Sequence, residues 1–119
     1  MLKRVLVVDD EESILFAYGR LLASEGFKVD VCATLDRAIE MLRFCQYDYV
    51  ISDMRINESN DTDGLSILKY VNDYMPSTQV IIATGYGDED TKRRAFELGA
   101  KYYFEKPIDT AKLLMILKE

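Results

Sequence analysis

The sequence predicts one α/β domain spanning residues 1–119, built from five repeats of a strand followed by a helix. Short apolar runs of the length of buried strands alternate with longer stretches in which apolar residues recur at three- and four-residue spacing, as in amphipathic helices. This alternation is typical of a parallel sheet with helices on both faces and right-handed crossovers. A chain of 119 residues suffices for one core and is too short for two ordinary domains.

The first repeat begins with the run Val5–Val8, whose β-branched residues suit a strand buried on both faces. This strand stops at two acidic residues, Asp9 and Asp10. Apolar residues then recur at helical spacing from Ser13 onward. Gly26 is expected to end that helix, because glycine readily takes the backbone conformation that follows a helix.

The other repeats follow the same pattern, and the third, fourth and fifth strands each end beside a polar or charged residue. The strands are expected at Phe27–Cys32, Tyr49–Ser52, Val80–Ala83 and Lys101–Phe104. The helices are expected after a capping Thr34, from Leu65 to before Pro76, through Arg94 and Leu98 to Gly99, and from Thr110 to Glu119 after Asp109. The stretch Asn57–Gly64, rich in Asn, Asp and Ser, is expected to be a loop, and Gly85–Asp88 a turn.

Composition excludes several classes of function. The net charge of −6 disfavours direct binding to nucleic acid or to anionic lipid. The chain has no histidine, which removes imidazole metal sites and Ser-His or Cys-His nucleophile pairs. Cys32 and Cys45 are interpreted as buried, reduced thiols. Without a signal peptide or a run of roughly 18 apolar residues, the chain is expected to be cytoplasmic.

Five polar residues follow the predicted strands and should meet at one edge of the sheet. They are Asp9 and Asp10 after the first strand, Asp53 after the third, Thr84 after the fourth and Lys106 after the fifth. Ligands of open parallel sheets bind beyond the carboxyl ends of the strands. Each residue alone has an ordinary explanation, such as a helix cap for an aspartate or solvation for the lysine. Their convergence favours a site.

Three neighbouring carboxylates repel one another unless a cation neutralises them. Oxygen ligands suit Mg²⁺, or Mn²⁺ in its place, whereas Zn²⁺ prefers Cys or His. Lys106 would supply a second positive charge. Such a site fits phosphoryl transfer, which depends on positioning and on charge stabilisation, with Asp53 as the nucleophile that forms an acyl phosphate.

The segments VLVVDDEE, ISDMR, IIATGYGDED and AFELGAKYYFEKPID resemble the signature segments of response-regulator receiver domains, and the resemblance spans nearly the whole chain. It implies a flavodoxin-like, doubly wound fold with strand order 2-1-3-4-5. It also implies that Asp53 is the phosphoacceptor and that Mg²⁺ is held by Asp10, Asp53 and the main-chain carbonyl of Arg55, with Asp9 acting largely through water.

The resemblance assigns roles to three further residues. Thr84 would contact the bound phosphoryl group, Lys106 would pair with it, and the ring of Tyr103 would turn inward when Thr84 moves. Lys106–Pro107 is a candidate cis peptide. The surface from the fourth helix to the fifth would report the added charge.

The same resemblance implies partners. The phosphoryl donor would be the phosphohistidine of a sensor histidine kinase or a phosphotransfer protein. A homodimer through the surface from the fourth helix to the fifth, and an output domain outside this chain, stay open, as does whether the domain is excised from a longer regulator.

The chain departs from the family pattern after the acceptor. The loop from Ile56 to Asp63 is longer than usual and lacks the usual proline. It borders the predicted metal site, so either an altered phosphoryl lifetime or no effect is open. Arg55 and Tyr86 each lie two residues past a site residue, and we hypothesise that their bulk lengthens the phosphoryl lifetime.

Two other functions are weighed beside a receiver that catalyses only its own phosphorylation and dephosphorylation. A Mg²⁺-dependent phosphohydrolase with an aspartate nucleophile would use a second aspartate two residues on, where this chain has Arg55. A phosphorylation-independent interaction module would not need the complete set of site residues. The sequence therefore favours the signalling receiver over a turnover enzyme.

Overall fold

The computed structural model describes residues 2–56, 63–85 and 88–119. Five parallel strands form one sheet in the order β2-β1-β3-β4-β5, which confirms the predicted order. The strands are β1 (Arg4–Val8), β2 (Lys28–Cys32), β3 (Tyr49–Ser52), β4 (Gln79–Thr84) and β5 (Tyr102–Glu105). The helices are α1 (Glu12–Ser24), α2 (Leu35–Phe44), α3 (Asp63–Tyr74), α4 (Glu89–Glu97) and α5 (Thr110–Leu117). The doubly wound, flavodoxin-like fold class is confirmed.

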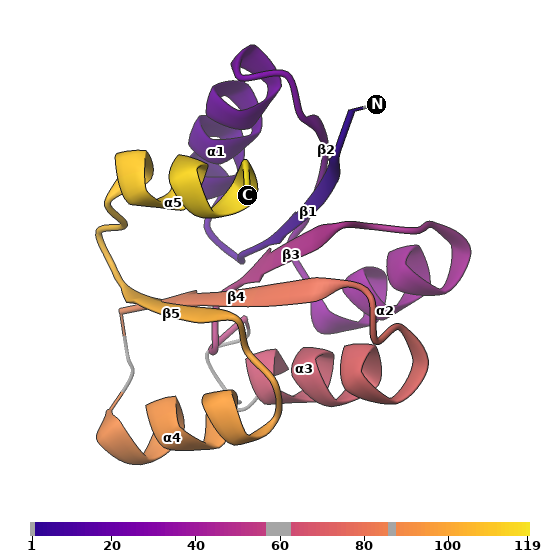
Figure 1. Ribbon diagram of the computed structural model, residues 1–119, viewed down its shortest axis with the longest axis vertical. Helices are drawn as coiled ribbons and strands as arrows, with labels where there is room; N and C mark the ends of the chain where they lie inside the picture. The colour runs from indigo at the N-terminus through magenta and orange to yellow at the C-terminus, as the bar shows by residue number, and fades with distance from the viewer. Residues whose placement is uncertain (1, 57–62, 86–87) are drawn as a thin grey trace.

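The helices divide between the two faces of the sheet, as Figure 1 shows: α1 and α5 cover one face, and α2, α3 and α4 cover the other. The interior strand β1, between β2 and β3, shows the consequence. Leu6 and Val8 belong to the apolar cluster beneath α2, α3 and α4, whereas Val5 and Val7 belong to the cluster beneath α1 and α5. Successive side chains of a strand point to opposite faces, so a strand covered on both sides is apolar throughout.

Several predicted element ends agree with the structure. β3 has the predicted bounds, and the Thr34 hydroxyl accepts a hydrogen bond from the Arg37 amide at the start of α2. Gly26 and Gly99 follow α1 and α4 with φ of +93° and +100°, conformations that glycine adopts without strain. The other strands and helices are displaced from the predicted bounds by one or two residues.

The prediction of a loop through Gly64 is wrong at its end, because α3 already includes Asp63 and Gly64. An acidic residue in the first turn of a helix is favourable, because it lies beside the positive end of the helix dipole. The local preference of such residues for loops does not include this effect. Residues 57–62 lie outside the described part of the chain. The last helix also ends earlier than predicted, at Leu117, and the Asp109 carboxylate caps it by accepting from the Lys112 amide.

The two cysteines are free, but only Cys32 is buried, and Cys45 is half-buried. The interpretation of both as buried thiols therefore holds for one of them. Cys32 lies at the end of the edge strand β2, beneath α2. Burial raises the pKa of its thiol from 9.0 to about 11, against a smaller lowering by Arg37.

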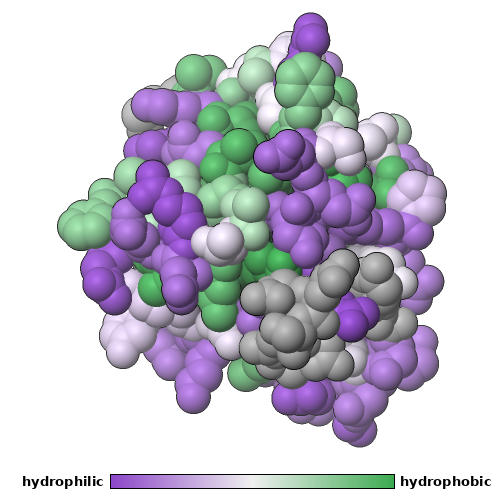
Figure 2. All heavy atoms as spheres, turned by 180° about the vertical axis from the view of Figure 1, so that it is seen from behind, coloured by the Kyte–Doolittle hydropathy of each residue, from purple (hydrophilic) through white to green (hydrophobic). Residues whose placement is uncertain are grey.

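Among the described residues, the exposed large apolar side chains do not share one helix face. Figure 2 shows the side opposite to Figure 1, where hydrophilic residues cover much of the periphery and hydrophobic residues gather nearer the middle. Exposed large apolar side chains are spread over different helices: Phe16, Phe44, Tyr74 and Met115. Among the described residues, no helix is both long and apolar enough to span a membrane.

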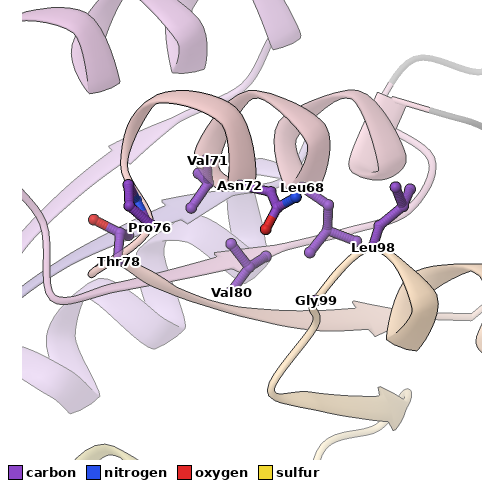
Figure 3. A pocket seen from close by; sticks show the side chains of 8 residues that line it. All are labelled: Leu68, Val71, Asn72, Pro76, Thr78, Val80, Leu98 and Gly99. Carbon is purple, nitrogen blue, oxygen red and sulfur yellow. The ribbon is translucent and has the colours of Figure 1, made fainter.

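A small cavity of about 60 Å³ lies between α3, β4 and the end of α4 (Figure 3). Its walls are mainly aliphatic, with Leu68 and Val71 from α3, Val80 from β4 and Leu98 after α4. Asn72 adds a polar side chain from α3. None of the polar residues that follow the strands lines this cavity, so it is distinct from the candidate site.

Candidate functional site

The sheet brings the ends of β1 and β3 together because these strands are direct neighbours, although another strand and two helices separate them in the chain. The amide of Asp53 donates to the carbonyl of Val8 (3.0 Å), which continues the pairing of the two strands to the edge. The amide of Asp9 donates in turn to the carbonyl of Cys32 at the end of β2 (3.1 Å). The acidic residues therefore lie where the strand order reverses, between β1 and β3. Doubly wound sheets bind their ligands at this position.

Three carboxylates form a cluster at this edge. Carboxylate oxygens of Asp9, Asp10 and Asp53 all lie within 4.8 Å of one another. Asp9 and Asp53 are each only 3% exposed, whereas Asp10 faces solvent. The donor set consists of oxygens, with one exposed member through which an ion can enter. It fits a hard divalent cation such as Mg²⁺.

Lys106 joins the two buried carboxylates. Its ammonium donates to Oδ2 of Asp9 at 2.6 Å and to Oδ2 of Asp53 at 2.9 Å. The Lys106 amide donates to the carbonyl of Thr84 (3.0 Å), so the turn after β5 is tied to the end of β4. The Lys106–Pro107 peptide is cis, as predicted.

The charge of Lys106 is stabilised by this environment. Burial by itself lowers the pKa of a lysine, but hydrogen bonds to Asp9 and Asp53, together with their negative charges, outweigh it and raise the pKa above its ordinary value. The lysine therefore stays an ammonium throughout the physiological pH range. It can pair with an anion that forms on either carboxylate.

Each buried carboxylate is also held by its own main chain. Oδ1 of Asp9 accepts from the Glu11 amide at 2.9 Å, and Oδ1 of Asp53 accepts from the Arg55 amide at 3.1 Å. One oxygen of each group is thus used locally and the other faces Lys106. Asp9 and Asp10 do not cap α1. The N-cap residue of this helix is Glu11, and its side chain makes no capping hydrogen bond. The ordinary explanation of Asp9 or Asp10 as a helix cap is therefore wrong.

Thr84 and Tyr103 stand on the neighbouring strands. Thr84 is fully buried at the end of β4, paired in register with Glu105 of β5. Tyr103 points into the protein with 7% exposure, its ring 6.5 Å from that of Phe96 and 6.0 Å from the ammonium of Lys92, both on α4. Burial, followed by nearby acidic groups that include Glu105, raises the pKa of its phenol.

The predicted site residues differ in how closely the structure joins them. Asp9, Asp10, Asp53 and Lys106 form one contiguous group. The main chain of Arg55 adjoins that group through its bond to Asp53. Tyr86 lies outside the described residues. The same is true of residues 57–62, which make up most of the loop that is longer than usual in the family.

Two residues near the site, Tyr18 and Gly64, were not among the predicted site residues. The phenol of half-buried Tyr18 on α1 has a raised pKa, first because of burial, and it also feels the charges of Lys106 and Asp9. Gly64 on α3 lies against the main chain at Asp53. Tyr18 belongs to the residues at helical spacing that follow Ser13, a pattern that predicts only a place on the buried face of the helix. For Gly64, the only indication in the sequence was the residue type, because glycine permits a close approach of main chains. It lay in a segment that was predicted to be a loop.

The fold and the site place this protein among the doubly wound α/β domains whose functional side chains lie at the carboxyl ends of the strands. Residues 5–118 match the family model of the response regulator receiver domain, and the chain belongs to this family. A putative response regulator described as NtrX-like, from Rickettsia bellii, is 37% identical over 114 residues, or 96% of this chain. Those residues are 24% of the relative, so the chain spans about a quarter of its length.

Solved structures support the assignment. The beryllofluoride-activated NtrC4 receiver domain dimer is 33% identical, with a TM-score of 0.88 over 98% of this chain and 94% of that one. A response regulator from Burkholderia pseudomallei was solved with a phosphorylated aspartic acid, a calcium ion and citrate. It is 25% identical, with a TM-score of 0.85 over 94% of this chain and 64% of that one. The chain is therefore a receiver domain of two-component signalling in sequence and in fold.

Proposed function

We propose that this receiver domain accepts a phosphoryl group on Asp53 from a partner histidine kinase, in a reaction that depends on Mg²⁺. The observation that carries the proposal is the position of Asp53: a buried carboxylate with one oxygen 2.9 Å from a lysine ammonium and two further carboxylates beside it. A group that must bear a dianion needs such cations nearby. The phosphorylated aspartic acid and the metal ion of the Burkholderia pseudomallei structure support the same conclusion.

Asp10, Asp53 and the main-chain carbonyl of Arg55 would hold the Mg²⁺, with Asp9 acting largely through water. The oxygen-only character of the cluster supports this choice, and Mn²⁺ could replace Mg²⁺. When bound, the ion would neutralise the carboxylates and the charge on the transferring oxygens. The exposed Asp10 makes the cluster accessible from solvent.

In the transfer step, a carboxylate oxygen of Asp53 forms a bond to phosphorus as the P–N bond of the phosphohistidine breaks. The electron pair of that bond returns to the imidazole ring, which leaves as neutral imidazole because its other nitrogen carries a proton. Asp53 is paired with the ammonium of Lys106, and a carboxylate nucleophile needs no base to activate it. Lys106 then pairs with the phosphoryl oxygens.

The phosphoryl group would switch the surface formed by α4, β5 and α5. It adds a charge of about −1.5 to −2 and three acceptor oxygens. Thr84 at the end of β4 is expected to donate to one of them, and the inward ring of Tyr103 to follow Thr84. Tyr103 contacts Phe96 and Lys92, so its position is coupled to α4. Such a local charge event can bias a bistable element.

The partner would be a sensor histidine kinase or a phosphotransfer protein. The length of the Rickettsia bellii relative supports a fused output domain, and the dimer formed by the NtrC4 receiver domain supports a homodimer, which we place at the α4–β5–α5 surface. Two free cysteines are consistent with a reducing compartment, and we place the domain in the cytoplasm.

We further propose that the domain is no turnover enzyme and catalyses only its own phosphorylation and dephosphorylation. Arg55 stands where an aspartate-dependent phosphohydrolase would carry its acid/base aspartate, two residues after the nucleophile. Continuous release of phosphate from small phosphate esters would contradict this statement.

The test is incubation with acetyl phosphate and Mg²⁺, followed by intact-mass measurement. Wild type should gain the mass of one phosphoryl group, and the gain should disappear when EDTA removes the metal. Asp53→Asn should show no adduct, while Asp36→Asn, which changes an exposed carboxylate on α2, should behave as wild type. An adduct that persists in Asp53→Asn would overturn the assignment. A wild type that never gains the adduct would favour a phosphorylation-independent interaction module.

A further inference from the structure

Gly64, the second residue of α3, lies unusually close to the main chain of the phosphoacceptor segment. A Cβ atom built at this position would be 2.7 Å from the Cα of Met54 and 2.8 Å from the carbonyl oxygen of Asp53. Both neighbours are backbone atoms, so no side-chain rotation relieves the overlap. The start of α3 can occupy this place because residue 64 has no side chain.

The contact is also a hydrogen bond. The Gly64 amide donates to the carbonyl of Met54 at 2.9 Å, and the Arg55 amide donates to Oδ1 of Asp53 at 3.1 Å. Met54 and Ile56 are each 2% exposed within the core. The peptides between Asp53 and Ile56 are therefore held by α3, by the acceptor carboxylate itself and by two buried side chains.

We propose that Gly64 is a positioning residue for the metal. By letting α3 close onto the main chain of Asp53 and Met54, it fixes the direction of the next carbonyl, that of Arg55, relative to the Asp53 carboxylate. This inference rests on the proposed function, in which that carbonyl and that carboxylate hold Mg²⁺. Displacement of ligand-orienting contacts of this kind weakens metal binding.

The loop after Asp53 lacks the proline that would restrict the backbone locally. In this chain the orientation of the acceptor segment comes instead from the far end of the loop, where Gly64 meets Met54. The restraint is a tertiary contact of α3 and does not require a stiff loop sequence.

The decisive experiment measures Mg²⁺ affinity by isothermal titration calorimetry in wild type, Gly64→Ala and Gly85→Ala. Gly85 is a matched control at the same edge of the sheet, because a Cβ there meets no atom of the described residues within 4 Å, its chain neighbours aside. Far-ultraviolet circular dichroism and thermal unfolding establish that each variant is folded at the titration temperature. Gly64→Ala should bind Mg²⁺ about tenfold more weakly, and Gly85→Ala should bind it as wild type does.

A purely structural role for Gly64 would lower the melting temperature and leave the Mg²⁺ affinity of the folded protein unchanged, and that result would overturn the inference. Failure of the wild type to bind Mg²⁺ would instead refute the proposed function, and the inference with it. The two failures are distinguishable because the first requires a wild type that binds the ion.

A second measurement on wild type covers the case in which Gly64→Ala does not fold. Amide hydrogen exchange followed by NMR should show that Mg²⁺ slows exchange of the Gly64 amide, because the ion and the bond to Met54 stabilise the same segment. The Gly19 amide within α1 serves as the reference. Unchanged exchange at Gly64 under saturating Mg²⁺ would contradict the positioning role.

Discussion

The ammonium of Lys106 lies 2.9 Å from Oδ2 of Asp53, although 53 residues separate the two in the chain. The same ammonium lies 2.6 Å from Oδ2 of Asp9. The side chain of Lys106 is 16% exposed, and those of the two aspartates 4% or less. One lysine thus balances two buried carboxylates, which makes it both a structural and a chemical element of the site.

Replacing Lys106 by methionine should therefore lower stability as well as phosphorylation. Two buried carboxylates lose their cation, and we expect the free energy of unfolding in EDTA to fall by about 1–3 kcal/mol. Added Mg²⁺ should restore part of the loss, because it neutralises the same groups. Urea unfolding with and without Mg²⁺ measures both effects. Lys69→Met, at an exposed position on α3, is the control, and equal stability of the two variants would contradict the prediction.

Asp10→Asn should separate metal binding from folding. Asp10 is exposed, so its neutralisation should change the free energy of unfolding little or raise it slightly by relieving repulsion in the cluster. The Mg²⁺ affinity should fall by about tenfold or more, since a charged oxygen ligand is lost. Calorimetric titration measures the affinity, and an affinity equal to that of wild type would remove Asp10 from the metal site.

The phosphoryl lifetime should depend on Arg55 and Tyr86. If their bulk hinders the hydrolysing water, Arg55→Asn combined with Tyr86→Ala should release phosphate faster, by about tenfold, because water reaches a near-attack geometry more often. Decay of the phosphorylated protein after removal of acetyl phosphate gives the rate. An unchanged decay rate in the double variant would refute the hypothesis.

Tyr103→Phe should leave stability unchanged or raise it slightly. Among residues 2–56, 63–85 and 88–119, the buried hydroxyl of Tyr103 has no hydrogen-bond partner, and an unpaired buried polar group costs free energy. Tyr103→Ala should instead cost about 3–5 kcal/mol, because it empties the space beside Phe96. Chemical unfolding of both variants tests this. A loss above about 1 kcal/mol in Tyr103→Phe would reveal a bond that the hydroxyl makes elsewhere.

Cys32 should contribute to alkaline unfolding. Its pKa is raised by burial from 9.0 to about 11, so the folded state retains the thiol proton to higher pH than the unfolded state does. The stabilisation is fully present below about pH 9 and is lost as the pH rises through about 11. Stability measured from pH 8 to 11 should therefore fall less steeply in Cys32→Ala than in wild type or in the half-buried control Cys45→Ala. Parallel curves for the two variants would contradict this.

Much of the fold could be predicted because the local patterns are strong. Continuous apolar strands such as Val5–Val8 and amphipathic helices identify a parallel sheet covered on both faces, and this burial is what the structure shows. The order of the strands came from the family resemblance, since periodicity carries no information on which strands are neighbours. The start of α3 was misplaced because Asp63 and Gly64 favour loops locally, whereas contact with Met54 holds them in the helix.

Which side chains meet could be predicted from the sequence, because parallel strands carry their carboxyl ends to one edge. Asp9, Asp10, Asp53 and Lys106 meet for this reason. The different roles of these residues depend on how the chain packs. Asp9 is buried against Lys106 while adjacent Asp10 faces solvent, since successive residues leaving a strand point in different directions. The close approach of Gly64 to Asp53 likewise depends on how α3 packs on the sheet, a long-range contact that no local pattern encodes.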